Sequence, residues 1–186
     1  YFMSVLIPIV IICYNNYKYV DNTVNQILQI NKEYFNAILI VDNCSTCEKT
    51  INYLKKSTCK VIFNEKNNGP WINTDTNTHV YNILPDKFIL TDPDLELNKN
   101  IPNNFIEILS LLSDKYDCKK IGLALDISDF DKMYHDILLF GHNIYVWEIR
   151  HWQNKISDDY YELYNAEIDT TFCLINKKSN STLNIR

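Results

Sequence analysis

The stretch IPIVIICYNN, residues 7–16, decides the fold class. Its first seven residues are apolar and mostly β-branched, a pattern typical of a strand that is buried on both faces. Such strands occur in parallel sheets that are covered by helices. The run is too short for a membrane helix, which needs about 20 apolar residues. The polar residues 14–16 are therefore predicted to lie at the carboxyl end of a buried strand.

The same pattern recurs along the chain. Further strands are predicted over residues 37–41, 60–63, 88–90, 121–125 and 171–175. Helices are predicted over residues 20–28, 51–54, 71–84, 102–112 and 147–153, with Val80 and Ile83 facing inward in the third. Strands that alternate with helices form right-handed β-α-β units. We therefore predict a single three-layer α/β/α, Rossmann-like domain with a mostly parallel central sheet.

Composition restricts the class of protein further. A chain of 186 residues, 46% hydrophobic and 22% charged, is typical of one soluble domain. Its net charge of −5 and scattered lysines argue against nucleic-acid binding. No basic segment or cleavage site of a signal peptide precedes the first strand, and six cysteines are expected to be reduced thiols. We expect a cytoplasmic protein without a transmembrane segment, and the sequence does not indicate an oligomeric state.

Polar residues follow four of the predicted strands, and ligands of open α/β sheets bind outside these carboxyl ends. Asp92-Pro93-Asp94 directly follows the strand at residues 88–90. Two carboxylates on one short turn suit Mg²⁺ or Mn²⁺. Asp-Pro-Asp is also a sequence that commonly forms a turn without any ligand. The preceding strand favours the metal interpretation.

The three glycines are too far apart for a dinucleotide or P-loop motif. The charge of a bound diphosphate would therefore have to be offset by a cation, which Asp92 and Asp94 could hold. Asp42 ends the second strand and could bind a base or ribose. It could equally form a turn with Asn43 and Ser45.

Four segments together resemble the family 2 glycosyltransferases of the GT-A fold. They are IPIVIICYNN at residues 7–16, ILIVDNCST at 38–46, NNGP at 67–70 and FILTDPDLEL at 88–97. The resemblance covers roughly the first 125 residues in the order and spacing of the family. It implies a nucleoside-diphosphate-sugar donor, usually UDP-linked, with Mn²⁺ or Mg²⁺ and inversion at the anomeric carbon.

The resemblance also implies roles for particular residues. Asp92 and Asp94 match the DxD motif that meets ribose, metal and diphosphate. The other implied donor-site residues are Tyr14, Asn15, Asp42, Asn43, Asn67, Asn68 and Gly69. Residues 4–97 would form the nucleotide-sugar half and residues 98–186 the acceptor half, which ends as a C-terminally truncated domain would.

An inverting enzyme needs an acidic base to take the proton of the acceptor hydroxyl. Asp169, just before the last predicted strand, is the first candidate and Glu148 the second. Either could instead be an ordinary surface carboxylate. The sequence does not predict whether the acceptor is a glycan, a lipid or a protein. It also does not predict whether the transferred sugar is a hexose or an N-acetylhexosamine.

Other interpretations stay open. A degenerate nucleotide-sugar-binding domain would share the donor site, and a nucleotidylyltransferase would share the sheet but usually carries a glycine-rich loop that this chain lacks. Cys44 and Cys47 have redox spacing but follow the second strand in a polar loop. No second cysteine pair supports zinc, and single histidines are seldom ligands (His79, His135, His142, His151). Aromatic residues are frequent in the segment 145–164. They could form a flat surface that binds the acceptor, or they could simply pack in the core or at an interface.

Overall fold

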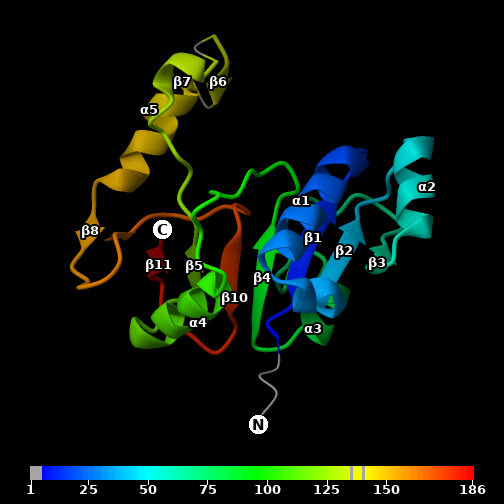
Figure 1. Ribbon diagram of the computed structural model, residues 1–186, viewed down its shortest axis with the longest axis horizontal. Coiled ribbons are helices and arrows are strands. Elements are labelled where there is room, and N and C mark those ends of the chain that lie inside the picture. Colours follow the sequence, from blue (N-terminus) through cyan, green and yellow to red (C-terminus); the bar gives the residue numbers. More distant parts are fainter. Residues whose placement is uncertain (1–5, 135, 140) are drawn as a thin grey trace.

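The computed structural model describes residues 6–134, 136–139 and 141–186. Its centre is a seven-stranded sheet with the order β11-β5-β10-β4-β1-β2-β3 (Figure 1). Only β10 runs against its neighbours, because it is antiparallel to both β4 and β5. The predicted mostly parallel sheet is therefore confirmed. Its strands are β1 (Ile9–Cys13), β2 (Ile38–Asp42), β3 (Lys60–Phe63), β4 (Lys87–Thr91), β5 (Lys120–Gly122), β10 (Cys173–Asn176) and β11 (Asn184–Ile185).

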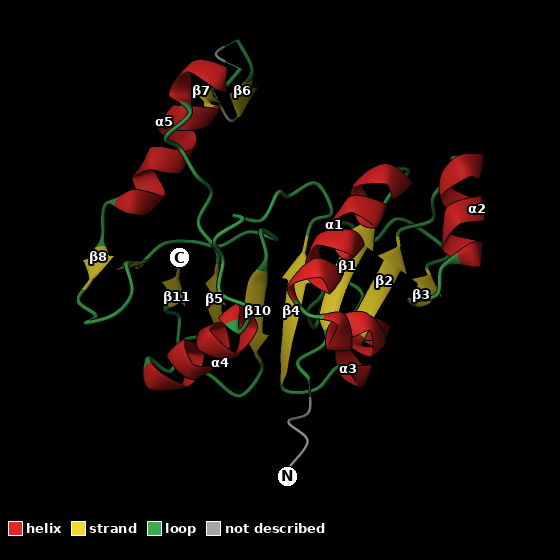
Figure 2. Cartoon of the chain, in the orientation of Figure 1, coloured by secondary structure: helices red, strands yellow, loops and turns green. Residues whose placement is uncertain are grey.

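Helices lie on both faces of the sheet, as the continuous apolar strands require (Figure 2). Ile9 and Ile11 of β1 pack in one apolar cluster with α1 (Tyr17–Ile30), α2 (Glu48–Lys56) and α4 (Phe105–Lys115). Val10 and Ile12 point to the opposite face and pack in a second cluster with α3 (Thr78–Ile83). This alternation confirms the three-layer prediction. Each fully buried aliphatic side chain of the two clusters stabilises the fold by about 1.5–3 kcal/mol.

Helix α1 illustrates how the sequence pattern produces the first layer. Its buried residues Val20, Val24 and Ile27 recur every three to four positions, so they form one stripe that faces the sheet. A 3-10 helix, η1 (Lys32–Ala37), then returns the chain to β2. In the ranges that the structure describes, no helix is long and apolar enough to cross a membrane.

The segment between β5 and β10 leaves the sheet and returns to it (Figure 1). Its described residues contain two small β-hairpins, one α-helix and two short 3-10 helices. These are η2 (Phe130–Lys132), β6 (Leu138–Leu139), β7 (His142–Asn143), α5 (Ile144–Ile149), η3 (Arg150–Trp152), β8 (Lys155–Ile156) and β9 (Leu163–Tyr164). The helix predicted over residues 147–153 corresponds to α5 and η3, whereas the hairpins were not predicted.

The predicted helix over residues 71–84 is wrong in its first half. Only Thr78–Ile83 is helical, and Asn77 before it has a left-handed φ of 51°. The Asn77 side chain donates to the Trp71 carbonyl at 2.8 Å, so hydrogen bonds to a loop replace the helical ladder. Val80 is buried as predicted, but Ile83 is 61% exposed and does not face the core.

Gly122 ends β5 at a point where the neighbouring strand leaves no room. A Cβ atom here would lie 2.9 Å from both the Cβ of Cys173 and the carbonyl oxygen of Phe172. Because that contact is with backbone and a buried side chain, the sheet must move to admit a methyl group. The strand predicted over residues 121–125 ends here, and residues 123–127 form a loop instead.

We expect Gly122→Ala to lower the free energy of unfolding by about 1–3 kcal/mol, the usual effect of overpacking. Urea denaturation monitored by circular dichroism measures the change. Leu111→Ala is the control, because Leu111 is 69% exposed and its loss should change stability by less than about 0.5 kcal/mol. An unchanged midpoint for Gly122→Ala would show that the β5–β10 contact is looser than described.

Candidate functional site

The candidate site lies where the carboxyl ends of β1, β2, β3 and β4 meet at one edge of the sheet. Because β10 is antiparallel, its first residues reach the same edge from the other direction. The backbone N–H of Asp92 donates to the Thr170 carbonyl at 2.9 Å and joins the two segments. The edge therefore combines residues from both halves of the chain.

Asn15 organises the loops that follow β1 and β2. Its Oδ1 accepts from the backbone N–H groups of Thr46 at 2.8 Å and Cys47 at 2.7 Å, just before α2. Its own backbone N–H donates to Ser45 Oγ at 2.9 Å, and its φ of 57° is one that asparagine tolerates. The side chain is thus occupied in holding these loops, whereas Tyr14 beside it is 46% exposed.

Asp42 is buried, with 3% of its surface exposed. Its carboxylate accepts from Ser45 Oγ at 2.5 Å and from the Ser45 backbone N–H at 3.2 Å. The turn interpretation of Asp42 is therefore present in the structure. A ligand that contacts this carboxylate would have to share it with Ser45.

A cluster of asparagines holds the loop over residues 67–77 against the edge of the sheet. Asn64 Nδ2 donates to Asn43 Oδ1 at 2.9 Å and to Asn77 Oδ1 at 2.7 Å. Asn43 Nδ2 in turn donates to the Gly69 carbonyl at 2.7 Å, and Asn68 Nδ2 reaches Asn77 Oδ1 at 3.2 Å. Gly69 has a φ of 80°, which favours glycine. Of the predicted donor-site residues, Asn43, Asn68 and Gly69 thus lie together, whereas the importance of Asn77 was not predicted.

Asn67 takes part in the same loop through a local contact. Its Oδ1 accepts from the backbone N–H of Gly69 at 2.8 Å, and the residue is exposed. The turn that it makes presents Asn67 and Gly69 at the surface next to the asparagine cluster.

Asp92 is fixed from two directions by Thr170. Thr170 is 2% exposed, and its hydroxyl donates to Asp92 Oδ2 while its carbonyl accepts from the Asp92 backbone. Burial raises the pKa of the Asp92 carboxyl, the Thr170 hydrogen bond lowers it, and the nearby carboxylates of Asp94 and Asp169 raise it further. Three carboxylates therefore lie close enough to interact at this edge.

The turn that holds Asp92 and Asp94 is also anchored from helix α1. Thr23 Oγ1 donates to the Pro93 carbonyl at 2.5 Å, and Gln26 Nε2 donates to the Leu95 carbonyl at 2.9 Å. The position of Asp94 is set by these backbone contacts, while its side chain is exposed. Such a fixed turn can present two hard oxygen ligands without reorganisation.

The donor set suits one type of metal ion. In the part of the chain that the structure describes, no three His, Cys, Asp or Glu side chains form a complete metal cluster. Mg²⁺ and Mn²⁺ commonly need only one or two carboxylates when phosphate oxygens and water complete the shell. Asp92 and Asp94 fit that requirement, and their mutual repulsion would be relieved by a cation.

We expect Thr170→Val to raise the pKa of Asp92, because it removes the hydrogen bond that favours the ionised carboxylate. A ¹³C NMR titration of the aspartate carboxyls measures this change. Thr170→Ser keeps the hydroxyl and should restore the pKa of Asp92. A titration that is the same in all three proteins would contradict the assignment of Thr170 as a positioning residue.

The two candidate bases have different surroundings. Glu148 is buried and forms an ion pair with Arg186 at 2.8 Å, next to His151, whose pKa is lowered by burial and then by Arg186. Asp169 is exposed and directly precedes Thr170. The structure therefore brings Asp169, but not Glu148, into electrostatic contact with Asp92.

Residues of the other sequence interpretations lie elsewhere. Cys47 is the N-cap residue of α2, where the hydrogen bond from the Thr50 backbone lowers its pKa. Cys44 has a left-handed φ of 62°. His135 lies outside the described residues.

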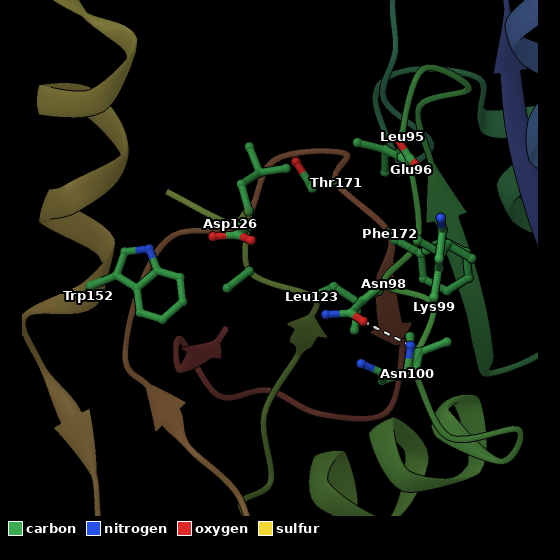
Figure 3. Close-up of a pocket in the computed structure, with 14 residues that line it drawn as sticks. Leu95, Glu96, Asn98, Lys99, Asn100, Leu123, Asp126, Trp152, Thr171 and Phe172 are labelled. Atoms are coloured by element: carbon green, nitrogen blue, oxygen red, sulfur yellow. Dashed lines mark hydrogen bonds between the residues drawn. The ribbon is translucent and has the colours of Figure 1, made fainter. Parts of the chain in front are cut away.

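A cavity of about 690 Å³ lies beside the Asp92–Asp94 turn (Figure 3). Residues 95–101, which continue from the turn, form one wall, and residues 123–126 after β5 form another. Trp152, Thr171 and Phe172 complete the lining. Among the crowded aromatic residues, Trp152 thus reaches the cavity, whereas the Trp147 ring is covered by the Arg150 guanidinium at 3.3 Å.

The segment that builds this edge is similar to a known protein family. Residues 9–100 match the family model of Glycosyl transferase family 2. The matched segment runs from β1 through the Asp92–Asp94 turn to the first cavity wall. No curated protein matches the sequence significantly.

The GT-A fold is supported by one solved structure with a TM-score above 0.5, and two others are less similar. A mannosyltransferase from Pyrobaculum calidifontis, in complex with GDP-Man and Mn²⁺, is 10% identical, with a TM-score of 0.53 over 91% of this chain and 44% of that one. TarS of S. aureus with UDP-GlcNAc is 19% identical (TM-score 0.45, 66% and 35% covered). Glucosyl-3-phosphoglycerate synthase of Mycobacterium tuberculosis with UDP is 14% identical (TM-score 0.40, 68% and 47% covered). The chain spans less than half the length of these three proteins.

Proposed function

We propose that the protein is a metal-dependent glycosyltransferase that moves a sugar from a nucleoside-diphosphate sugar, UDP-linked in our proposal, to an acceptor hydroxyl. The observation that carries this proposal is the Asp92–Asp94 turn, fixed at the carboxyl edge of the sheet by Thr170 and α1. It lies inside residues 9–100, which match the family 2 model, and next to a cavity that can hold a second substrate.

In this proposal the donor lies along the edge from β1 to β4. Tyr14 is exposed at the end of β1 and can contact the base, with Asp42 buried beside the ribose. The loop at Asn67 to Gly69 lines the sugar-diphosphate path. Asp92 and Asp94 hold Mn²⁺ or Mg²⁺, which when bound offsets the charge of the departing diphosphate.

Asp169 acts as the base in the proposed reaction. It takes the proton of the acceptor hydroxyl while the bond from that oxygen to the anomeric carbon forms and the bond to the diphosphate oxygen breaks. Attack from the side opposite the diphosphate inverts the anomeric carbon. Glu148 is the less suitable base, because its carboxylate is already paired with Arg186 in a buried site.

Release of nucleoside diphosphate tests the proposal. The protein is incubated with UDP-, GDP- and dTDP-sugars, with Mn²⁺ or with a chelator, and the products are separated by ion-exchange chromatography. We expect release from one nucleotide class only, and only with the metal. Metal-dependent binding without release would instead indicate a nucleotide-sugar-binding domain. Conversion of the nucleotide sugar and added pyrophosphate to nucleoside triphosphate and sugar 1-phosphate would indicate a nucleotidylyltransferase.

A further inference from the structure

The cavity beside the Asp92–Asp94 turn has a fixed apolar base. Phe172, 1% exposed, packs against Phe105 of α4 with ring centroids 5.2 Å apart. Leu97, Ile101 and Leu123 add aliphatic surface. A volume of about 690 Å³ is ample for a sugar ring, since small-molecule sites range from about 300 to 1,000 Å³.

Trp152 supplies a flat aromatic wall. Its ring packs against Tyr164 at a centroid distance of 5.4 Å and an interplanar angle of 59°. Figure 3 shows the indole on the side of the cavity opposite residues 98–100. Flat aromatic rings of this kind can pack against the C–H face of a pyranose, which is apolar.

Polar groups line the same cavity at positions where hydroxyl groups could meet them. Asp126 Oδ1 accepts from the Ser128 backbone N–H at 2.8 Å, which orients the carboxylate and lowers its pKa, so it is ionised at neutral pH. Asn98 Oδ1 accepts from the Asn100 backbone N–H at 2.9 Å (Figure 3). The N–H₂ group of the same amide can then donate to a ligand. A carboxylate acceptor and an amide donor can together bind adjacent hydroxyls.

We propose that this cavity binds a pyranose ring of the acceptor, with its apolar face on Trp152 and its hydroxyls on Asp126 and Asn98. The inference rests on the proposed function and deepens it, because it makes the acceptor a carbohydrate. Two cavity walls continue directly from the reacting groups: Leu95 follows Asp94, and Thr171 follows Asp169 by two positions. A purely apolar acceptor, such as a lipid chain, could not hydrogen-bond to Asp126 or Asn98, which are both exposed.

Saturation-transfer NMR tests the inference with the methyl glycosides of glucose, galactose, mannose and N-acetylglucosamine. We expect at least one glycoside to bind, and Trp152→Ala to weaken its affinity about tenfold, the effect of losing an aromatic contact. Trp152→Tyr should retain affinity within about threefold. Tyr160→Ala is the matched control, because Tyr160 is 85% exposed and lies outside the cavity.

Two results would overturn the inference. One is the absence of signal from every glycoside, whether or not octyl phosphate, a lipid probe, gives a signal. The other is equal affinity of the glycoside for the wild type and for Trp152→Ala. Thermal melting confirms that the variants are folded. If Trp152→Ala is not folded, Asp126→Ala serves instead, because Asp126 is exposed and its loss should also weaken glycoside binding.

Donor binding is measured on the same proteins so that the two proposals can fail separately. Trp152→Ala should bind nucleotide sugar with Mn²⁺ as the wild type does, whereas Asp94→Ala should lose the donor and keep the glycoside. Donor binding without glycoside binding contradicts only the carbohydrate acceptor. Glycoside binding without any donor binding contradicts the proposed transferase.

Discussion

Asp94→Ala is expected to reduce sugar transfer about 10²- to 10³-fold. A metal that offsets diphosphate charge stabilises the transition state by several kcal/mol, and each 1.36 kcal/mol is a factor of ten in rate. Asp94 is exposed on a turn whose backbone is held by Thr23 and Gln26, so its removal should leave the fold intact. Initial rates at increasing Mn²⁺ concentration measure the loss.

The companion variant Asp92→Asn separates function from stability. The folded-state pKa of Asp92 is raised, so its contribution to stability is fully present below the ordinary pKa and is lost as pH rises through the folded-state value. Above the folded-state pKa the ionised carboxylate therefore destabilises the fold. Asp92→Asn removes this charge and keeps an acceptor for Thr170, so we expect a higher melting temperature without metal, together with lost transfer. A lower melting temperature at pH 7 and an unchanged rate would contradict the role of Asp92.

Asp169→Asn is expected to lower kcat by about 10²- to 10⁴-fold, the usual contribution of general base catalysis. Donor affinity should stay the same, because in the proposed reaction Asp169 acts on the acceptor hydroxyl. Steady-state kinetics, with donor binding measured by calorimetry, check both points.

Glu148→Gln provides the contrast for Asp169→Asn. It removes one partner of the buried pair with Arg186, so it should destabilise the fold by about 3–5 kcal/mol. Any folded fraction should retain kcat. If Glu148→Gln were stable and inactive while Asp169→Asn remained active, the assignment of the base would have to be reversed.

The buried strands were predictable because their signal is local. Continuous apolar runs at β1 and β2 require cover on both faces, and residues after such strands must lie at one edge of the sheet. The positions of Asp42, Asp92 and Asp94 at that edge follow from strand boundaries alone. Their ligands and roles do not.

Other features depend on contacts between distant residues. Asn77, which lies just before α3, also accepts a hydrogen bond from Asn64, 13 positions away, and no local periodicity reveals that contact. Trp152 and Asp126 meet at one cavity only because the segment after β5 leaves the sheet and returns. Thr170 fixes Asp92 from 78 positions away, although a threonine just before an apolar strand was visible in the sequence.

The most direct test of the central claim is a calorimetric titration of UDP- and GDP-sugars into the protein with Mn²⁺, with a chelator, and into Asp94→Ala with Mn²⁺. If the Asp92–Asp94 turn binds the metal and the donor, one class of nucleotide sugar should bind saturably to the wild type with Mn²⁺. No binding should occur to the wild type with the chelator or to Asp94→Ala with Mn²⁺. Equal binding with the chelator or in Asp94→Ala, or no binding of any nucleotide sugar, would contradict it.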